Sequence, residues 1–242
     1  MRAAHLTPLA LLLFVATHAS ADPPKRLQLS DLPCTGCKVS YEPDHDPAPR
    51  KEKPVIVLLH GDWGVGPSDL LAAWEKLAAK RDIDLLALKC PVDKGCDKGS
   101  WWQWNGDPAW VTKQVDDVAT KRNILIDRKR MYLVGWSGGA SYIGMRAQAF
   151  QQTFAAIVYH GGGVAPSGPC APASASPAPA YFLVGDANPL HHLAVALKKQ
   201  NEQCGVNVTW KLLPGADHTA EWKALDANGG AIADWLLTQK RP

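Results

Sequence analysis

One serine stands in a setting that favours nucleophilic chemistry. Ser137 is the centre of GWSGG, residues 135–139, which follows an apolar run and precedes a helical pattern. In a G-x-S-x-G motif between a strand and a helix, the serine occupies a strained turn that lifts its Oγ above the sheet edge. The helix that follows aims backbone N–H groups at a developing oxyanion. The motif in this context predicts a nucleophile at Ser137.

Two further motifs fit the same chemistry. HGDWG, residues 60–64, follows the apolar run PVIVLL, and a loop there can supply an oxyanion N–H from Asp62 or Trp63. GADH, residues 215–218, ends the last apolar run. A histidine there can reach the serine as its general base, so we expect His218 in that role.

Alternating strands and helices must position these residues. The apolar runs are continuous, as in strands that helices cover on both faces, so we expect a mostly parallel sheet in a three-layer α/β domain. Reactive groups then gather at the carboxyl ends of the strands. The expected strands, some of which run into a turn at their end, are residues 53–61, 83–91, 130–139, 154–163, 180–186 and 207–218. The expected helices are residues 68–82, 107–123, 140–150, 189–203 and 220–240.

Residues 53–239 resemble the α/β-hydrolase superfamily, and within it the secreted esterases of the polyhydroxybutyrate-depolymerase and feruloyl-esterase group. A Trp-containing segment is followed by a stretch similar to that group's IDxxRxYxxGxSxGG. The matching residues are Ile126, Asp127, Arg130, Tyr132, Gly135, Ser137, Gly138 and Gly139. The resemblance implies an α/β-hydrolase fold, Ser137 as nucleophile, His218 as base and the Gly138 N–H in the oxyanion hole.

The position of the acid departs from the family pattern. The family places the acid three residues after the glycine of YFLVGDANPLHH, residues 181–192, and that position holds Asn188. An amide can accept a hydrogen bond from the imidazole but cannot offset its charge, and Asp→Asn in a serine protease lowers turnover about 10⁴-fold. Either Asp186, two residues earlier, or Asn188 orients His218. We favour Asp186 because a carboxylate stabilises a developing cation better; Asp217 is interpreted as a turn residue.

Aromatic residues indicate a substrate pocket. The chain has 10 tryptophans, and several gather in one loop or flank the motifs above. We expect these aromatic side chains to form one wall of a pocket that binds an acyl group or a sugar ring. HGGG, residues 160–163, follows the strand after the nucleophile, so it is interpreted as a pocket rim rather than an oxyanion motif. The predicted pocket residues are Trp101, Trp102, Trp104, Trp136 and His160.

The N-terminus has the pattern of a secretory signal. A positive start, a short apolar core and Ala19-Ser20-Ala21 predict cleavage after residue 21. The apolar core is shorter than the roughly 20 residues that span a bilayer, and no later segment is long enough. The predicted organisation is a signal peptide (1–21), an N-terminal arm (22–52) and one hydrolase domain (53–242). The formal net charge of +3 is spread without a basic stripe, which argues against nucleic-acid binding.

The six cysteines suit an oxidising compartment. An even count behind a signal peptide predicts disulfides, although six cysteines allow 15 pairings. We expect local pairing, with a redox or zinc site at CTGC, residues 34–37, as the alternative. The expected pairs are Cys34 with Cys37, Cys90 with Cys96, and Cys170 with Cys204.

Together these features predict a serine carboxylic-ester hydrolase that is secreted or periplasmic. Its expected partner is a small or polymeric ester, and no cofactor or metal is expected. Two alternatives stay open. A catalytically impaired hydrolase-like binding protein is motivated by Asn188, and the same nucleophile and base would also serve a serine peptidase.

Overall fold

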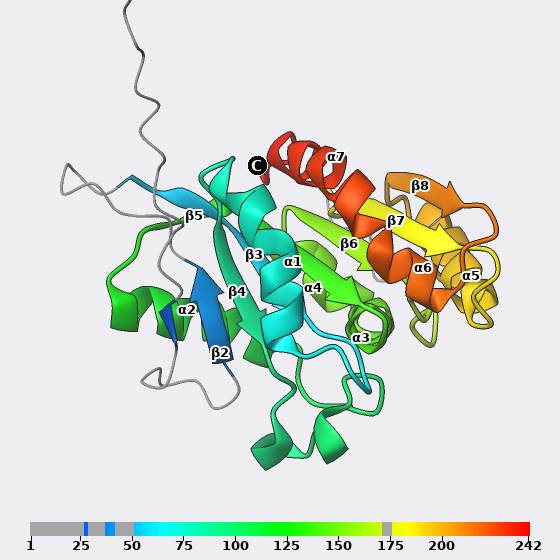
Figure 1. Ribbon diagram of the computed structural model, residues 1–242, viewed down its shortest axis with the longest axis horizontal. Helices are drawn as coiled ribbons and strands as arrows, with labels where there is room; N and C mark the ends of the chain where they lie inside the picture. The colour runs from blue at the N-terminus through cyan, green and yellow to red at the C-terminus, as the bar shows by residue number, and fades with distance from the viewer. Residues whose placement is uncertain (1–26, 29–36, 42–50, 171–175) are drawn as a thin grey trace, which may run out of the picture.

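The computed structural model describes residues 27–28, 37–41, 51–170 and 176–242 (Figure 1). The predicted signal peptide, residues 1–21, and Cys34 lie outside the described residues, and Cys37 is described by its backbone alone. The predicted pairing of these two cysteines therefore stays a prediction. The other two predicted disulfides, Cys90–Cys96 and Cys170–Cys204, are confirmed. None of the described helices is both long and apolar enough to cross a membrane.

The described strands form one mostly parallel sheet. Its order is β1-β2-β4-β3-β5-β6-β7-β8. The six strands from β3 to β8 all pair in parallel with one another. At one edge of these six strands, β2 pairs antiparallel with β4, and β1 pairs antiparallel with β2. The strands are β1 (Leu27–Gln28), β2 (Cys37–Tyr41), β3 (Lys53–Leu59), β4 (Asp84–Leu88), β5 (Ile126–Trp136), β6 (Ala156–His160), β7 (Ala180–Gly185) and β8 (Val208–Leu213).

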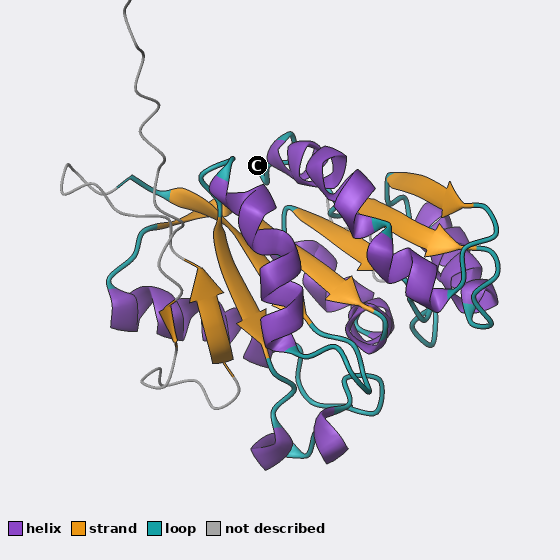
Figure 2. Cartoon of the chain, in the orientation of Figure 1, coloured by secondary structure: helices purple, strands orange, loops and turns teal. Residues whose placement is uncertain are grey.

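Helices cover both faces of this sheet, which completes the predicted three-layer α/β architecture (Figures 1 and 2). Alternate residues of β3 point to opposite faces: Val57 and Leu59 join one buried cluster, and Ile56 and Leu58 join the other. The first cluster includes side chains of α2 to α5, and the second includes those of α1 and α7. The helices are α1 (Pro67–Ala79), η1 (Val92–Lys94), η2 (Asp97–Gly99), α2 (Ala109–Arg122), α3 (Gly138–Met145), α4 (Ala147–Thr153), α5 (His191–Gln203), α6 (His218–Lys223) and α7 (Leu225–Leu237).

Three elements differ from the sequence-based expectation. The arm, residues 22–52, was expected to lie outside the domain, but β2 pairs with β4 and extends the sheet. The helix expected over 140–150 is two helices that meet at Arg146. The C-terminal helix is also divided, at Ala224, and its first part begins at residue 218 rather than 220. This last difference changes the environment of His218.

Candidate active site

The turn after β5 holds Ser137 in a strained conformation. Its backbone has φ 52° and ψ −111°, a region that side-chain-bearing residues rarely adopt. The close packing requires glycine on both sides: a Cβ at Gly135 would lie 2.5 Å from the Ala140 nitrogen, and one at Gly139 would overlap the carbonyl oxygen of Leu59. The Ser137 N–H donates to the His160 carbonyl at 2.9 Å, which ties the turn to β6. The strained turn expected from GWSGG is therefore present.

His218 reaches this turn from the first residue of α6. Asp217 caps that helix, because its Oδ1 accepts a hydrogen bond of 2.8 Å from the Ala220 N–H. The His218 Nε2 lies 2.9 Å from the Ser137 Oγ. One face of the His218 ring stacks on the ring of Trp136, with the two centroids 4.6 Å apart and the two planes at 5°. The stacking and the cap together fix where the imidazole can point.

The carboxylate beside His218 is Glu221, a residue that the sequence analysis missed. Its Oε2 lies 2.8 Å from the His218 Nδ1, and its side chain is 1% exposed. Glu221 follows His218 by three residues on α6, a spacing that places two side chains on one face of a helix. The serine, the imidazole and a carboxylate thus form a hydrogen-bonded series within the predicted site.

The structure places the two candidates for the acid, Asp186 and Asn188, in different surroundings. The Asp186 carboxylate accepts from the Gly215 N–H at 2.6 Å, so it braces the turn before α6 rather than the imidazole. Asn188 is close, with its Nδ2 3.2 Å from the His218 Nδ1, but that amide group donates to Glu221 at 2.7 Å. Asp186 does not lie against the imidazole; the carboxylate that does, Glu221, belongs to a helix that was predicted to begin two residues too late.

Trp136 and His160, both predicted to line the pocket, are buried beneath His218 instead. They are 3% and 1% exposed, and their rings are 4.5 Å apart. The His160 Nε2 donates to the Glu221 carbonyl at 2.7 Å, so it supports α6 from below. Burial lowers the pKa of His160 from its ordinary 6.5 to about 4, with Glu221 opposing and His218 reinforcing that shift. His160 is therefore neutral at pH 7.

Because His160 is neutral in the folded chain, we predict that the free energy of unfolding decreases in acid. Between pH 6.5 and 4 the unfolded chain binds a proton at His160 and the folded chain does not, so the free energy of unfolding decreases as the pH falls. The shift corresponds to about 3 kcal/mol lost by pH 4. His160→Gln keeps an N–H donor near Nε2 but does not titrate. Urea unfolding of both chains from pH 7 to pH 4 should show the smaller loss in the variant; equal losses would contradict the assignment.

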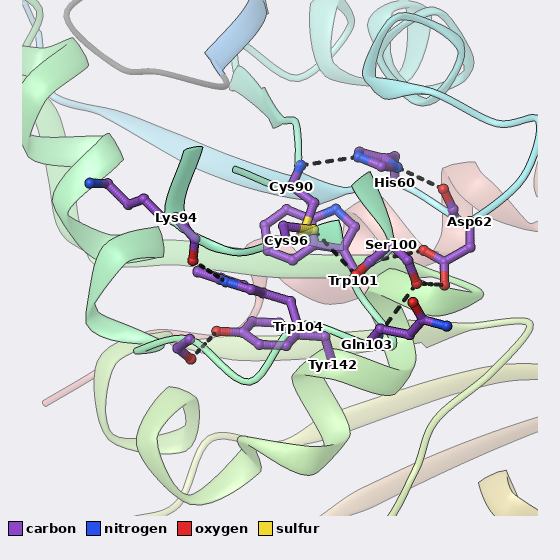
Figure 3. Close-up of a disulfide and its surroundings, with 12 residues drawn as sticks. His60, Asp62, Cys90, Lys94, Cys96, Ser100, Trp101, Gln103, Trp104 and Tyr142 are labelled. Carbon is purple, nitrogen blue, oxygen red and sulfur yellow. Dashed lines mark hydrogen bonds between the residues drawn. A yellow bond between two sulfur atoms is a disulfide. The ribbon is translucent and has the colours of Figure 1, made fainter. Parts of the chain in front are cut away.

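A buried network fixes the loop that carries Asp62 and Trp63 (Figure 3). The Asp62 carboxylate accepts from the Ser100 Oγ at 2.7 Å and from the Trp101 N–H at 2.9 Å. The His60 ring donates from Nδ1 to the Gly61 carbonyl at 2.6 Å and accepts at Nε2 from the Cys90 N–H at 3.2 Å. These bonds require a neutral ring, and burial lowers the pKa of His60 in agreement.

The disulfide Cys90–Cys96 lies in the segment to which this loop is bonded. Gly138 begins α3 directly beside the Asp62 carboxylate, which leaves no room for a side chain there. Gly138, Asp62 and Trp63 all line one cavity together with Ser137. The three predicted oxyanion residues are thus gathered beside the serine, and their part in binding an oxyanion remains a prediction.

That cavity is the space into which a substrate could enter. It has a volume of about 220 Å³, and its wall combines glycines with apolar side chains. Trp63 and Leu190 at its mouth are 89% and 47% exposed. The predicted rim at 160–163 contributes Gly161, Gly162 and Gly163. The complete lining is Asp62, Trp63, Trp102, Gln103, Ser137, Gly138, Ser141, Gly161, Gly162, Gly163, Leu190 and Leu193.

Of the three loop tryptophans predicted to wall the pocket, the structure places Trp102 at the cavity. The expectation for Trp101 and Trp104 was wrong: they are 0% and 3% exposed and pack into the core. Their rings lie 5.5 Å apart, and both contact Tyr142, at 5.2 and 5.1 Å (Figure 3). The Trp104 Nε1 also donates to the Lys94 carbonyl at 3.2 Å, which satisfies its polar edge.

Comparison with known proteins adds evidence from structure alone. No family model and no curated protein matches the sequence. Among solved structures, a thermostable esterase matches with a TM-score of 0.59 and 21% identity, over 84% of this chain and 59% of that one. A Bacillus cereus carboxylesterase matches with 0.58 and 19%, over 77% and 88%. The chain has the α/β-hydrolase fold.

A third matched structure has a substrate bound. It is the fluorophosphonate-binding serine hydrolase F of Staphylococcus aureus, with a TM-score of 0.60 and 13% identity, over 84% of this chain and 94% of that one. The chain thus spans 59% of the thermostable esterase but about nine-tenths of the other two proteins. At these identities the comparison establishes the fold, and any assignment of activity depends on the site itself.

Proposed function

We propose that the chain is a serine hydrolase that cleaves carboxylic esters through an acyl-enzyme. The observation that carries the proposal is the 2.9 Å contact between the Ser137 Oγ and the His218 Nε2, made in a strained turn at the carboxyl end of β5. A hydroxyl so placed can lose its proton to the imidazole as it attacks. The matched thermostable esterase and carboxylesterase agree with this chemistry.

The reaction has two halves. The Ser137 Oγ bonds to the ester carbonyl carbon while His218 takes its proton, and the carbonyl electrons move to the oxygen. Backbone N–H groups of Gly138 and of Asp62 or Trp63 stabilise that oxyanion. The imidazolium protonates the leaving alcohol as the C–O bond breaks, which leaves the acyl group on Ser137. Water then attacks the acyl carbon with His218 again as base, and the acid departs.

The binding-protein alternative loses its motivation. It depended on the absence of a carboxylate at Asn188, and Glu221 supplies one 2.8 Å from the imidazole. We further propose that the protein is exported to the periplasm or the medium. The N-terminal signal pattern and the disulfides Cys90–Cys96 and Cys170–Cys204 support export, since such bonds persist in oxidising compartments.

Covalent labelling tests the proposal directly. The purified chain should react with a fluorophosphonate at Ser137, identified by peptide mass, and should hydrolyse p-nitrophenyl acetate with a burst of nitrophenolate before the steady state. Hydrolysis of the ester but not of a matching p-nitroanilide would separate an esterase from a peptidase. A chain that neither labels nor hydrolyses the ester contradicts the proposal. The N-terminal residue of the exported protein, expected to be Asp22, tests the signal.

A further inference from the structure

Asn188 holds the family's acid position but interacts with Glu221 rather than with the imidazole. It is 6% exposed, its Nδ2 donates to the Glu221 Oε2 at 2.7 Å, and its Oδ1 accepts from the Leu190 N–H at 2.9 Å. The bond from Leu190 fixes which end of the amide faces Glu221, because the reverse orientation would set Oδ1 against a carboxylate oxygen. When the His218 Nδ1 carries a proton for Glu221, it and Nδ2 are both donors, so their 3.2 Å approach is not a hydrogen bond.

Glu221 is held at every polar group. Its Oε1 accepts from the Gly185 N–H at 2.6 Å, and its Oε2 accepts from Asn188 and faces the His218 Nδ1 at 2.8 Å. Its backbone carbonyl accepts from His160 at 2.7 Å. A buried carboxylate remains charged only when it is paired and hydrogen-bonded. Strand β7, the turn after it and β6 thus all contribute donors that keep this carboxylate beside the imidazole.

We propose that Glu221 is the positioning carboxylate of this hydrolase and that Asn188 is the residue that holds it. The proposal rests on the ester-hydrolase function proposed above. Glu221 keeps the His218 proton on Nδ1, leaves the Nε2 lone pair facing Ser137 and stabilises the imidazolium that forms. The acid function has therefore moved from the turn after β7 to the first turn of α6, and the vacated position has become its support.

The geometry makes the two roles exchangeable. The Asn188 Nδ2 and the Glu221 Oε2 are 2.7 Å apart. They lie 3.2 and 2.8 Å, respectively, from the His218 Nδ1. Asn188→Asp and Glu221→Gln each preserve side-chain length, so the double variant keeps one carboxylate and one amide in the same contact. A carboxylate introduced at 188 can accept from the His218 Nδ1, and the amide introduced at 221 can donate to it. The pair should therefore work in either order.

The exchange experiment uses the full chain and a p-nitrophenyl ester. Glu221→Gln should lower kcat about 10³- to 10⁴-fold with KM nearly unchanged, as expected when an imidazole loses its charged partner. The double variant, Asn188→Asp with Glu221→Gln, should recover at least about tenfold of that loss. Two carboxyl groups at 2.7 Å cannot both stay ionised, so Asn188→Asp alone should shift the acidic limb of the pH–rate profile upward. The titratable groups that face the pair are His218 and His160.

Two controls separate positioning from structure. Glu202→Gln removes an exposed carboxylate that is paired with Lys198, and its kcat should equal that of the wild type. Asp186→Asn removes the carboxylate that was favoured from the sequence; it should cost much less than Glu221→Gln. Thermal unfolding of every variant identifies any that are not folded. If Glu221→Gln unfolds, the double variant decides, because its carboxylate–amide pair should restore turnover only if a carboxylate beside the His218 Nδ1 is what the reaction needs.

The outcomes are distinct. Wild-type kcat in Glu221→Gln, an equal loss in Asp186→Asn, a double variant no better than Glu221→Gln, or an unshifted pH profile would each overturn the inference. All four leave the ester-hydrolase proposal intact, provided that the wild type labels at Ser137 and turns over. A wild type that neither labels at Ser137 nor hydrolyses the ester contradicts the proposed function itself, and the roles of Glu221 and Asn188 would then not be at issue.

Discussion

Ser137→Ala is expected to lower kcat for a p-nitrophenyl ester by roughly 10⁵- to 10⁶-fold, the size of loss seen when a serine hydrolase is left without its nucleophile. No other described hydroxyl is shown bonded to the His218 Nε2, which lies 2.9 Å from the Ser137 Oγ. Without that oxygen no acyl-enzyme forms. The remaining rate reflects water attacking a substrate that the site still binds. Initial rates, the burst and fluorophosphonate labelling should all be lost together.

The matched control for this prediction is Ser68→Ala. Ser68 is an exposed serine on α1, outside the predicted site, and its removal should leave kcat and labelling unchanged. Near-normal hydrolysis by Ser137→Ala, with labelling at another residue, would place the nucleophile elsewhere. Unchanged thermal unfolding in the variant confirms that activity was lost through chemistry rather than through the fold.

Much of this site could be predicted because its signals are local. The glycines at 135 and 139 reflect close backbone contacts within and beside one turn, so they mark that turn in the sequence itself. Continuous apolar runs similarly predicted the parallel strands and the two helical layers. The two disulfides that join neighbouring segments, at separations of 6 and 34 residues, followed from the same preference for local pairing.

The sequence analysis missed Glu221 because its contact with His218 depends on where a helix begins. With the helix started at 220, His218 belonged to a turn and had no helical neighbours. Asp217 was interpreted as a turn residue, but it is an N-cap that starts α6 at residue 218. With that start, the three-residue spacing would have placed Glu221 beside the imidazole. A helix boundary moved by two residues therefore changes which carboxylate is assigned.

The other errors concern burial, which a sequence motif does not specify. Trp101, Trp102 and Trp104 are nearly adjacent, yet Trp102 alone lines the cavity, because the loop's path turns the other two into the core. Trp136 looked like a pocket wall from its place next to Ser137. It instead supports the His218 ring from below, and only the packing of α6 over β5 and β6 reveals this.

His218→Ala is expected to lower kcat by about 10⁵-fold, nearly as much as Ser137→Ala, because a serine hydroxyl is a weak nucleophile without a base. The two residues act as one unit, so the double variant should be no slower than Ser137→Ala alone. Rates of ester hydrolysis for the wild type, both single variants and the double variant form the cycle that measures this.

Losses that multiply in the double variant would mean that Ser137 and His218 act independently, which their 2.9 Å contact contradicts. Loss of the stacking on Trp136 is the structural alternative for His218→Ala. His218→Phe restores an aromatic ring without a basic nitrogen, and it should be as inactive as the alanine variant. Recovery of activity in that variant would show that the ring's packing, and not its basicity, supports turnover.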